Sequence, residues 1–187
     1  MLIGILSFQG DYFLHKKTLD NINIKSIYVN DNITLNKTDA LIIPGGESTV
    51  ISKFLQDSKL DKEIKRYSLN KSIFGTCAGA IIMSNECDDD SINTLKIMNI
   101  KTYRNSWGRQ IDSFEKEIKL NFNTNNFYAS FIRAPRIKIL SSDIEPLSYI
   151  GKNPVLVRNK NHLVASFHPE ISINSLIHEY FINMIYE

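Results

Sequence analysis

Unbroken apolar runs, each followed by a loop and a helical stretch, are the feature that most limits how this chain can fold. Such runs lie at residues 2–8, 24–29, 40–43 and 72–74, and helical stretches are predicted at 12–20, 49–56, 61–69 and 78–85. Strands buried on both faces of a parallel sheet have continuous apolar sequences, whereas strands with one wet face alternate. Strand and helix alternating at this spacing predict right-handed βαβ units and therefore an open parallel sheet.

The second half of the chain has a different pattern. Short extended runs separated by Asn, Pro and Gly predict antiparallel strands at 127–132, 137–140, 154–158 and 162–167, and a last amphipathic helix is predicted at 173–186. No repeat or low-complexity linker divides residues 1–187. The expected fold class is α/β, in one domain: a three-layer, flavodoxin-like, open and mostly parallel sheet with helices on both faces and additional antiparallel strands in the C-terminal half.

Charge and composition exclude several classes of function. The 22 Lys and Arg are balanced by 20 Asp and Glu, which leaves a net charge of +2, and the two signs are interspersed. A protein that binds nucleic acid through phosphate contacts needs clustered cations, so no nucleic-acid partner is expected. No stretch approaches the ~20 apolar residues that cross a bilayer, and the first apolar run is too short for a signal peptide. With two cysteines and no zinc-binding spacing, the sequence predicts a cytoplasmic protein without membrane contact or metal.

A cysteine between two glycines is the strongest candidate for chemistry. The predicted strand at 72–74 continues into Gly75-Thr76-Cys77-Ala78-Gly79, a G-x-C-x-G arrangement at a strand-to-helix turn. This is the layout of a nucleophile elbow, where small neighbours make room for a strained residue. The start of a helix also favours the thiolate, which is the nucleophilic form of cysteine. A lone cysteine is more often a small buried hydrophobe, and Cys87, which lacks this frame, is assigned that role.

A histidine and a glutamate supply the other half of a catalytic triad. The strand predicted at 162–167 is followed by His168-Pro169-Glu170. Residues two apart in an extended segment point to the same side, so Glu170 can orient His168, and His168 can take the thiol proton of Cys77. A His-x-Glu pair alone is most often a surface ion pair. Because both loops are expected at one edge of the sheet, the triad is the preferred interpretation.

A glycine-rich loop is predicted at the same edge. The run at 40–43 continues into Pro44-Gly45-Gly46-Glu47-Ser48, which has neither the Lys of a P-loop nor a dinucleotide-binding spacing. Its backbone N–H groups suit a phosphate or the oxyanion of an acyl-transfer intermediate, or its glycines merely form a turn. Next to a cysteine nucleophile, oxyanion stabilisation is preferred.

Polar residues without such a context are expected to be structural or solvated. They are His15, His162, His178 and the acidic run Asp88-Asp89-Asp90, which is predicted to be a solvated turn.

Three sequence blocks resemble those of class I, or triad-type, glutamine amidotransferases: PGGEST at 44–49, GTCAG at 75–79 and HPE at 168–170. Three more blocks resemble, more narrowly, the glutaminase subunits of pyridoxal 5′-phosphate synthase complexes: LSFQGD at 6–11, RNSWGRQIDSFE at 104–115 and FIRAP at 131–135. Together the blocks span the chain, and the one at 104–115 is the most specific.

The resemblance implies hydrolysis of L-glutamine to L-glutamate and ammonia without a cofactor. The ammonia would pass to a separate synthase subunit, which in this family is a (β/α)8 barrel, within a hetero-oligomer that makes pyridoxal 5′-phosphate. Cys77 would form a γ-glutamyl thioester, and His168, held by Glu170, would protonate the departing ammonia and then activate water. The backbone N–H groups of Gly46 and Ala78 would stabilise the oxyanion.

Further residues are implied for substrate and partner. Those implied to bind glutamine are Gly46, Glu47, Ser48, Arg104, Ile132 and Arg133. A guanidinium suits the α-carboxylate because it can bond both oxygens. Gln9 and Gly10 are implied at the interface with the synthase.

Other functions stay open on the residues alone. One is a glutaminase or γ-glutamyl hydrolase that serves another pathway, and the block at 104–115 argues against it. The others are a non-catalytic, cysteine-bearing stress protein of the same fold and a regulator that binds without turnover. The intact set of Cys77, His168 and Glu170 argues against both.

Overall fold

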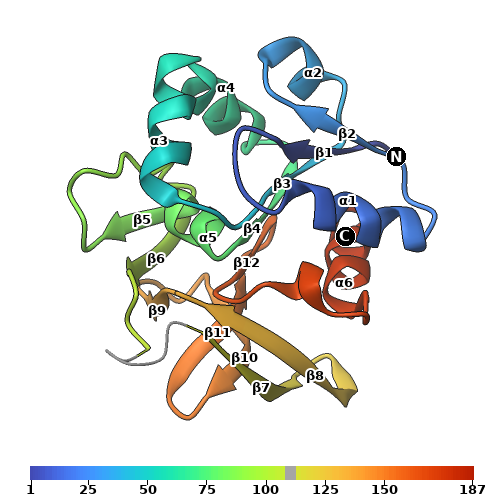
Figure 1. Cartoon of the computed structure of the whole chain (residues 1–187), viewed down its shortest axis with the longest axis vertical. Helices are drawn as coiled ribbons and strands as arrows, with labels where there is room; N and C mark the ends of the chain where they lie inside the picture. Colours follow the sequence, from blue (N-terminus) through green and yellow to red (C-terminus); the bar gives the residue numbers. More distant parts are fainter. Residues whose placement is uncertain (108–112) are drawn as a thin grey trace.

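A mostly parallel sheet forms the centre of the molecule (Figure 1). The computed structural model describes residues 1–107 and 113–187. Across these residues the main sheet has seven strands in the order β10-β11-β12-β4-β3-β1-β2. Their bounds are β1 (Ile3–Leu6), β2 (Ser26–Val29), β3 (Ala40–Ile43), β4 (Ser72–Thr76), β10 (Glu145–Ile150), β11 (Asn153–Arg158) and β12 (His162–Ala165).

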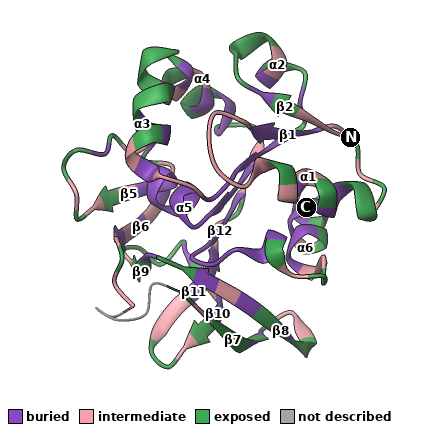
Figure 2. Cartoon of the chain, viewed as in Figure 1, coloured by how far each residue is buried: buried purple, intermediate pink, exposed green. Residues whose placement is uncertain are grey.

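Helices cover both faces of this sheet and give the three layers that the sequence predicts. They are α1 (Tyr12–Asn21), α2 (Asn32–Asn36), α3 (Ser48–Asp57), α4 (Leu60–Tyr67), α5 (Ala78–Met83), the short 3-10 helix η1 (Pro169–Ile171) and α6 (Leu176–Met184). One buried cluster joins the sheet to α3, α4 and α5, and a second joins it to α1 and α6. Figure 2 shows the resulting pattern, in which the central strands and α5 are buried and α1, α3 and α4 have exposed outer sides. The α/β fold class is therefore confirmed.

The alternation of side chains along β4 explains why its sequence is continuously apolar. Ile73 packs in the cluster under α3 to α5, while its neighbour Phe74 packs in the cluster under α1 and α6. Both side chains are fully buried. A strand with two buried faces needs apolar residues at its odd and its even positions, and this is why its sequence does not alternate.

The prediction for the strand at 162–167 was wrong in its direction. β12 pairs in parallel with β4 and antiparallel only with β11. It lies inside the sheet, where its four residues are all buried. A strand that is parallel to β4 ends at the same edge, and this places the residues after Ala165 beside those after Thr76.

Two small sheets flank the main one. β5 (Ser84–Cys87), β6 (Met98–Tyr103) and β9 (Arg136–Ile139) form one, and β7 (Ser113–Leu120) and β8 (Asn123–Ile132) form a hairpin. The backbone N–H of His168 donates to the carbonyl of Ser130 in β8 at 2.9 Å. The hairpin is thus bonded to the segment that follows β12. Within the described residues, no helix is both long and apolar enough to span a bilayer.

A buried histidine links two central strands. Nδ1 of His162, at the start of β12, accepts a hydrogen bond from the backbone N–H of Ile73 in β4 at 3.2 Å. Its side chain is buried, and this burial lowers its pKa to about 4. The ring is therefore neutral in the folded chain at pH values where an exposed histidine is charged.

We expect the free energy of unfolding to fall as the pH is lowered from 6.5 towards 4. In that window the unfolded chain binds a proton at His162 and the folded chain does not, which costs about 2 kcal/mol at pH 5. His178, whose pKa burial lowers to about 3, adds to the effect in the same direction. Urea denaturation at pH 7, 6 and 5 measures the slope. His162→Asn keeps an acceptor for Ile73, so a slope that is not reduced by this change would contradict the assignment.

Candidate active site

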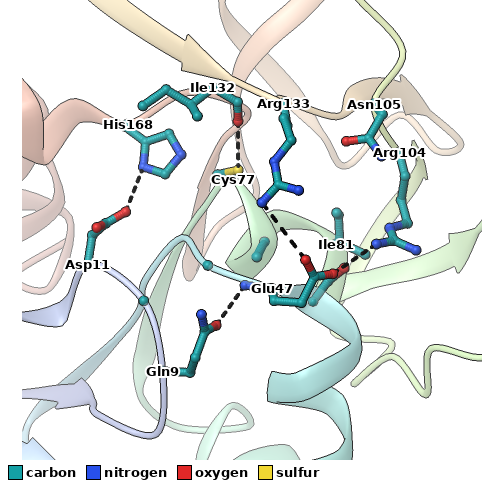
Figure 3. A pocket seen from close by; sticks show the side chains of 14 residues that line it. Gln9, Asp11, Glu47, Cys77, Ile81, Arg104, Asn105, Ile132, Arg133 and His168 are labelled. Atoms are coloured by element: carbon teal, nitrogen blue, oxygen red, sulfur yellow. Dashed lines mark hydrogen bonds and ion pairs between the residues drawn. The ribbon is translucent and has the colours of Figure 1, made fainter. Parts of the chain in front are cut away.

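The carboxyl ends of the central parallel strands surround a pocket of about 330 Å3 (Figure 3). The loops that follow β1, β3, β4 and β12 all contribute to it. Every predicted site residue lines this pocket except Glu170, which is buried behind it; those that line it are Gln9, Gly10, Gly46, Glu47, Ser48, Cys77, Ala78, Arg104, Ile132, Arg133 and His168. Asp11 and Asn105 also line it. Residues 108–112 of the block at 104–115 lie outside the described residues.

Cys77 lies at a strained turn between β4 and α5. Its backbone has φ 49° and ψ −103°, and its side chain is almost fully buried. A left-handed residue that is not glycine costs about 1–3 kcal/mol, so the surroundings must hold it in place. A Cβ on Gly79 would lie 2.0 Å from the carbonyl oxygen of Ile43, which leaves no room for a side chain there. These are the geometric properties of the nucleophile elbow that the sequence predicts.

His168 stands beside this cysteine and is held from behind. Its Nδ1 lies 2.7 Å from Oε1 of Glu170 and 3.4 Å from Oδ2 of Asp11. Because Nδ1 faces these carboxylates, Nε2 is the ring nitrogen left to exchange a proton with a thiol. A Cβ built on Gly45 would lie 2.3 Å from Cε1 of His168 and 3.3 Å from Cβ of Cys77. The two catalytic candidates therefore pack against the same glycine.

The electrostatics of His168 favour its charged form. Burial disfavours the imidazolium, but hydrogen bonds with Asp11, Cys77 and Glu170 outweigh burial and raise the pKa of His168. Burial also raises the pKa of Glu170, against the opposing effect of its bond to His168. Groups joined by a bond this short titrate as a pair. An imidazolium next to Cys77 stabilises a thiolate, which is what nucleophilic attack requires.

The predicted oxyanion loop is bonded to the turn after β1. The side-chain Oε1 of Gln9 accepts from the backbone N–H of Glu47 at 2.6 Å, and the N–H of Asp11 donates to the carbonyl of Gly45 at 3.2 Å. Gly46 has φ +152°, and a Cβ there would lie 2.5 Å from Oε1 of Gln9. Gln9 therefore controls the position of the backbone next to Gly46.

Charged side chains occupy the other end of the pocket. Oε1 of Glu47 accepts from Nη2 of Arg104 at 3.1 Å, and Oε2 of Glu47 lies 3.9 Å from Nη2 of Arg133. Arg133 has a left-handed backbone at φ 45°, and its side chain is 60% exposed. Figure 3 shows both guanidinium groups pointing towards Glu47. Ser48, the first residue of α3, is buried and also lines the pocket.

The backbone of Ile132 contacts the candidate nucleophile Cys77. Its carbonyl oxygen accepts from Sγ of Cys77 at 3.6 Å, while its side chain is 40% exposed.

The prediction that residues 88–90 form a solvated turn is confirmed for Asp88 and Asp90, which are exposed, while Asp89 is half-buried. The sequence did not indicate that two of these carboxylates bond Arg104. Oδ1 of Asp88 accepts from the backbone N–H of Arg104 at 2.9 Å, and Asp89 bonds the Arg104 guanidinium. The acidic run follows β5, whose partner β6 ends just before Arg104, so the pairing of these strands brings the charges together. Like-charge runs are usually solvated, as this one mostly is, and only the tertiary pairing adds the bonds to Arg104.

Several polar residues near the triad carry no local sequence signal. Asp11 contacts His168, and His15 and His178 are fully buried behind Glu170. His15 and His178 are 163 positions apart in the chain, yet their rings are bonded to each other. Asp11, His168 and Glu170 each place an atom that could ligate a metal, a ring nitrogen or a carboxylate oxygen, within 4.8 Å of the other two. Because His168 and Glu170 already share a hydrogen bond, we interpret this cluster as part of the predicted triad.

Comparison with known proteins places this geometry in a family. The family model described as "SNO glutamine amidotransferase family" matches residues 5–187. The pyridoxal 5′-phosphate synthase subunit PdxT of Fervidobacterium nodosum is 38% identical over 188 residues, which cover 100% of this chain and 98% of that protein. The protein of the same name from Thermosipho africanus is 39% identical and covers 99% of both chains.

Solved structures agree with the sequence comparison. A crystal structure of a glutamine amidotransferase superposes with a TM-score of 0.94 at 34% identity, over 99% of both chains. A glutamine amidotransferase from Thermotoga maritima, at 12% identity and a TM-score of 0.59 over 98% of this chain and 83% of that one, shares the fold. The family that the sequence blocks resemble is thus confirmed: this chain belongs to the SNO glutamine amidotransferase family.

Proposed function

We propose that this chain hydrolyses L-glutamine to L-glutamate and ammonia and delivers the ammonia to a synthase subunit that makes pyridoxal 5′-phosphate. The observation that carries the proposal is the pocket itself. Cys77 lies at its wall with His168 and Glu170 bonded behind it at 2.7 Å, and guanidinium groups lie at its other end. The destination of the ammonia is supported by relatives that are named as subunits of a pyridoxal 5′-phosphate synthase.

The chemistry follows from the positions of these groups. Sγ of Cys77 attacks the carboxamide carbon of glutamine, and the N–H groups of Gly46 and Ala78 stabilise the negative oxygen that forms. His168 donates a proton to the leaving nitrogen, which departs as ammonia and leaves a γ-glutamyl thioester on Cys77. His168 then takes a proton from water, which attacks the thioester and releases glutamate. Glu170 stabilises the charged ring in both steps.

The charges at the far end of the pocket match those of an amino acid. Arg104 and Arg133 carry two positive charges, and Glu47 and Asp89 carry two negative ones. Arg104 is already bonded to both carboxylates, whereas Arg133 is mostly exposed and 3.9 Å from Glu47. We infer that Arg133 meets the α-carboxylate, that Glu47 receives the α-amino group, and that Arg104 orients Glu47. Ser48 and Ile132 complete the wall around this end.

Replacing Arg133 by Met is expected to raise the glutamine KM by about 10- to 100-fold with a smaller change in kcat, because a hydrogen bond to a charged group contributes about 1.5–3 kcal/mol. Arg104→Met should raise KM as well, through the loss of its hold on Glu47. Steady-state kinetics of glutamate formation measure both. Arg66→Met on α4, where the side chain is 74% exposed, is the matched control and should leave KM unchanged. An unchanged KM in Arg133→Met would assign this residue a structural role.

We further infer that residues 1–187 form one domain and that the consumer of ammonia is a separate polypeptide, in a cytoplasmic hetero-oligomer with a (β/α)8-barrel synthase. With a net charge of only +2, docking rests on shape and apolar contact rather than on bulk electrostatics. Gln9 and Gly10 are the proposed contact. Since Gln9 bonds the backbone N–H of Glu47, a partner that moves this side chain also moves the oxyanion loop.

Mixing the chain with its cognate synthase tests the proposal. We expect slow glutamate formation alone, a marked rise with the synthase, and pyridoxal 5′-phosphate formation from glutamine as the only nitrogen source. Equal glutaminase rates with and without the synthase would argue against partner activation. Hydrolysis of γ-glutamyl peptides in place of glutamine would favour the γ-glutamyl hydrolase alternative.

A further inference from the structure

A line of buried polar side chains extends from the triad carboxylate into the core. It runs from Glu170 to His15 on α1 and from there to His178 on α6, and Thr76 at the end of β4 lies beside it. The side chains of Glu170, His15 and His178 are fully shielded from solvent. None of the steps described above uses the two histidines.

Contacts along this line are short. Nε2 of His15 is hydrogen-bonded to Oγ1 of Thr76 at 3.2 Å and lies 3.3 Å from Oε2 of Glu170. This second contact is an ion-pair distance, and Oε2 has no hydrogen-bond partner among the described residues. Nδ1 of His15 lies 2.9 Å from Nε2 of His178. Oε1 of Glu170 is the oxygen that bonds His168. Each oxygen of the buried carboxylate therefore faces a different imidazole ring.

The ionised carboxylate fixes where the protons lie. Nε2 of His15 must carry a proton, because a bare nitrogen and a carboxylate oxygen would both be acceptors. A neutral His15 then has a bare Nδ1, which can only accept, so Nε2 of His178 must be the donor. Nδ1 of His178 is left as a buried acceptor without a partner among the described residues. Oε2 of Glu170 likewise accepts no hydrogen bond of normal geometry. This arrangement of protons places an N–H, and not a second lone pair, opposite that oxygen.

The surroundings keep both rings neutral. Phe74 presents its edge or face to His15 at 6.3 Å and to His178 at 5.8 Å between ring centroids. Burial lowers the pKa of both histidines. The titratable groups that face this line are His168 and Asp11 at its active-site end. An uncompensated buried charge is costly, so a carboxylate in such an apolar site depends on every N–H dipole that faces it.

We propose that His15 and His178 are positioning residues of the triad: the Nε2–H of His15 faces the second oxygen of Glu170 and stabilises its negative charge, and His178 fixes the tautomer of His15, so that Glu170 stays ionised and aimed at His168. The inference rests on the proposed function only for its catalytic consequence. Its effect on the protonation of Cys77 exists without any substrate.

Alkylation of Cys77 by iodoacetamide as a function of pH tests the proposal without glutamine. All variants carry Cys87→Ala, so that one thiol reacts. In His15→Leu the N–H that faces Glu170 is lost, so the buried carboxylate is more easily protonated. A neutral Glu170 stabilises the imidazolium of His168 less, and the thiolate of Cys77 therefore forms at higher pH. We expect the midpoint of the alkylation rate to rise by about one pH unit, a tenfold change in the thiolate equilibrium. His15→Gln keeps an N–H near the position of Nε2 and should restore the midpoint.

The second histidine provides the matched test. His178→Phe should shift the midpoint in the same direction by less, and His15→Leu with His178→Phe should shift it no further than His15→Leu alone, because His178 acts through His15. Circular dichroism and thermal melting identify the folded variants. A wild-type midpoint in folded His15→Leu, or equal midpoints in His15→Leu and His15→Gln, overturns the proposal.

Turnover of glutamine separates this inference from the proposed function. If the chain is a glutaminase, kcat in His15→Leu should fall about 10- to 100-fold with KM within twofold of wild type, and His15→Gln should recover most of it. If no variant, wild type included, hydrolyses glutamine while the alkylation midpoints shift as expected, the proposed function fails and the positioning role stands.

Discussion

Ammonia release from glutamine is expected to fall by a factor of about 10⁴ or more when Cys77 is replaced by alanine. The covalent route passes through a thioester on Sγ, and no other thiol among the described residues lines the pocket. Removing the nucleophile of a triad typically costs this factor in kcat, because the histidine and the carboxylate act through the nucleophile and only the oxyanion hole and substrate binding remain. Glutamate formation in the presence of the synthase is the measurement.

Matched variants separate loss of the nucleophile from loss of structure. Cys87→Ala removes the other cysteine, whose Sγ contacts Asp88 outside the pocket, and should keep wild-type kcat. His168→Asn should be as inactive as Cys77→Ala, since the thiolate then lacks its counter-ion. Substantial turnover in Cys77→Ala would remove the mechanism altogether.

The second large effect is expected from Gly45→Ala. The new methyl group would lie 2.3 Å from Cε1 and 2.9 Å from Nδ1 of His168, so the ring must move away from Cys77. A displacement of about 1 Å in a catalytic group can cost 10²-fold in rate. We therefore expect kcat to fall by about 100-fold with the KM for glutamine nearly unchanged, because Glu47 and Arg133 are not displaced.

Gly151→Ala is the control for a glycine replacement as such. Gly151 has φ +59° in the turn between β10 and β11, and a Cβ there meets nothing within 4 Å. It should cost about 1 kcal/mol of stability through backbone strain and leave kcat unchanged. If Gly45→Ala folds and turns over at the wild-type rate, the packing of His168 against this glycine has no catalytic consequence.

The parallel core could be predicted from the sequence because its signal is local. A strand such as β3, buried on both faces, has an unbroken apolar sequence that no surface element shares. The β7 strand went unpredicted because most of its residues are exposed or half-buried and rich in Glu and Lys. The direction of β12 could not be read from its own residues, since parallel pairing depends on which strand lies beside it, and β4 is far away in the sequence.

Site residues likewise fall into those that local sequence reveals and those that only the tertiary fold reveals. Cys77 and His168 lie in short motifs with fixed spacing, so local geometry is enough to find them. His15 and Asp89 act through partners that only the tertiary fold supplies, Glu170 for the first and Arg104 for the second. The sequence around a histidine does not show whether its side chain is buried or solvated. For His15, packing against Phe74 in the folded chain decides this.

The place of β12 inside the sheet also sets the order in which the molecule can be completed during synthesis. Its first residue, His162, bonds Ile73 across 89 positions of the chain. Until β12 has been made, β4 presents an open apolar edge, and such edges pair readily with other chains. Contacts this distant are formed late because the intervening loop must close first. The proposed nucleophile and its proposed base thus meet only when the last strand enters the sheet, and a nascent or C-terminally shortened chain carries Cys77 without His168 beside it.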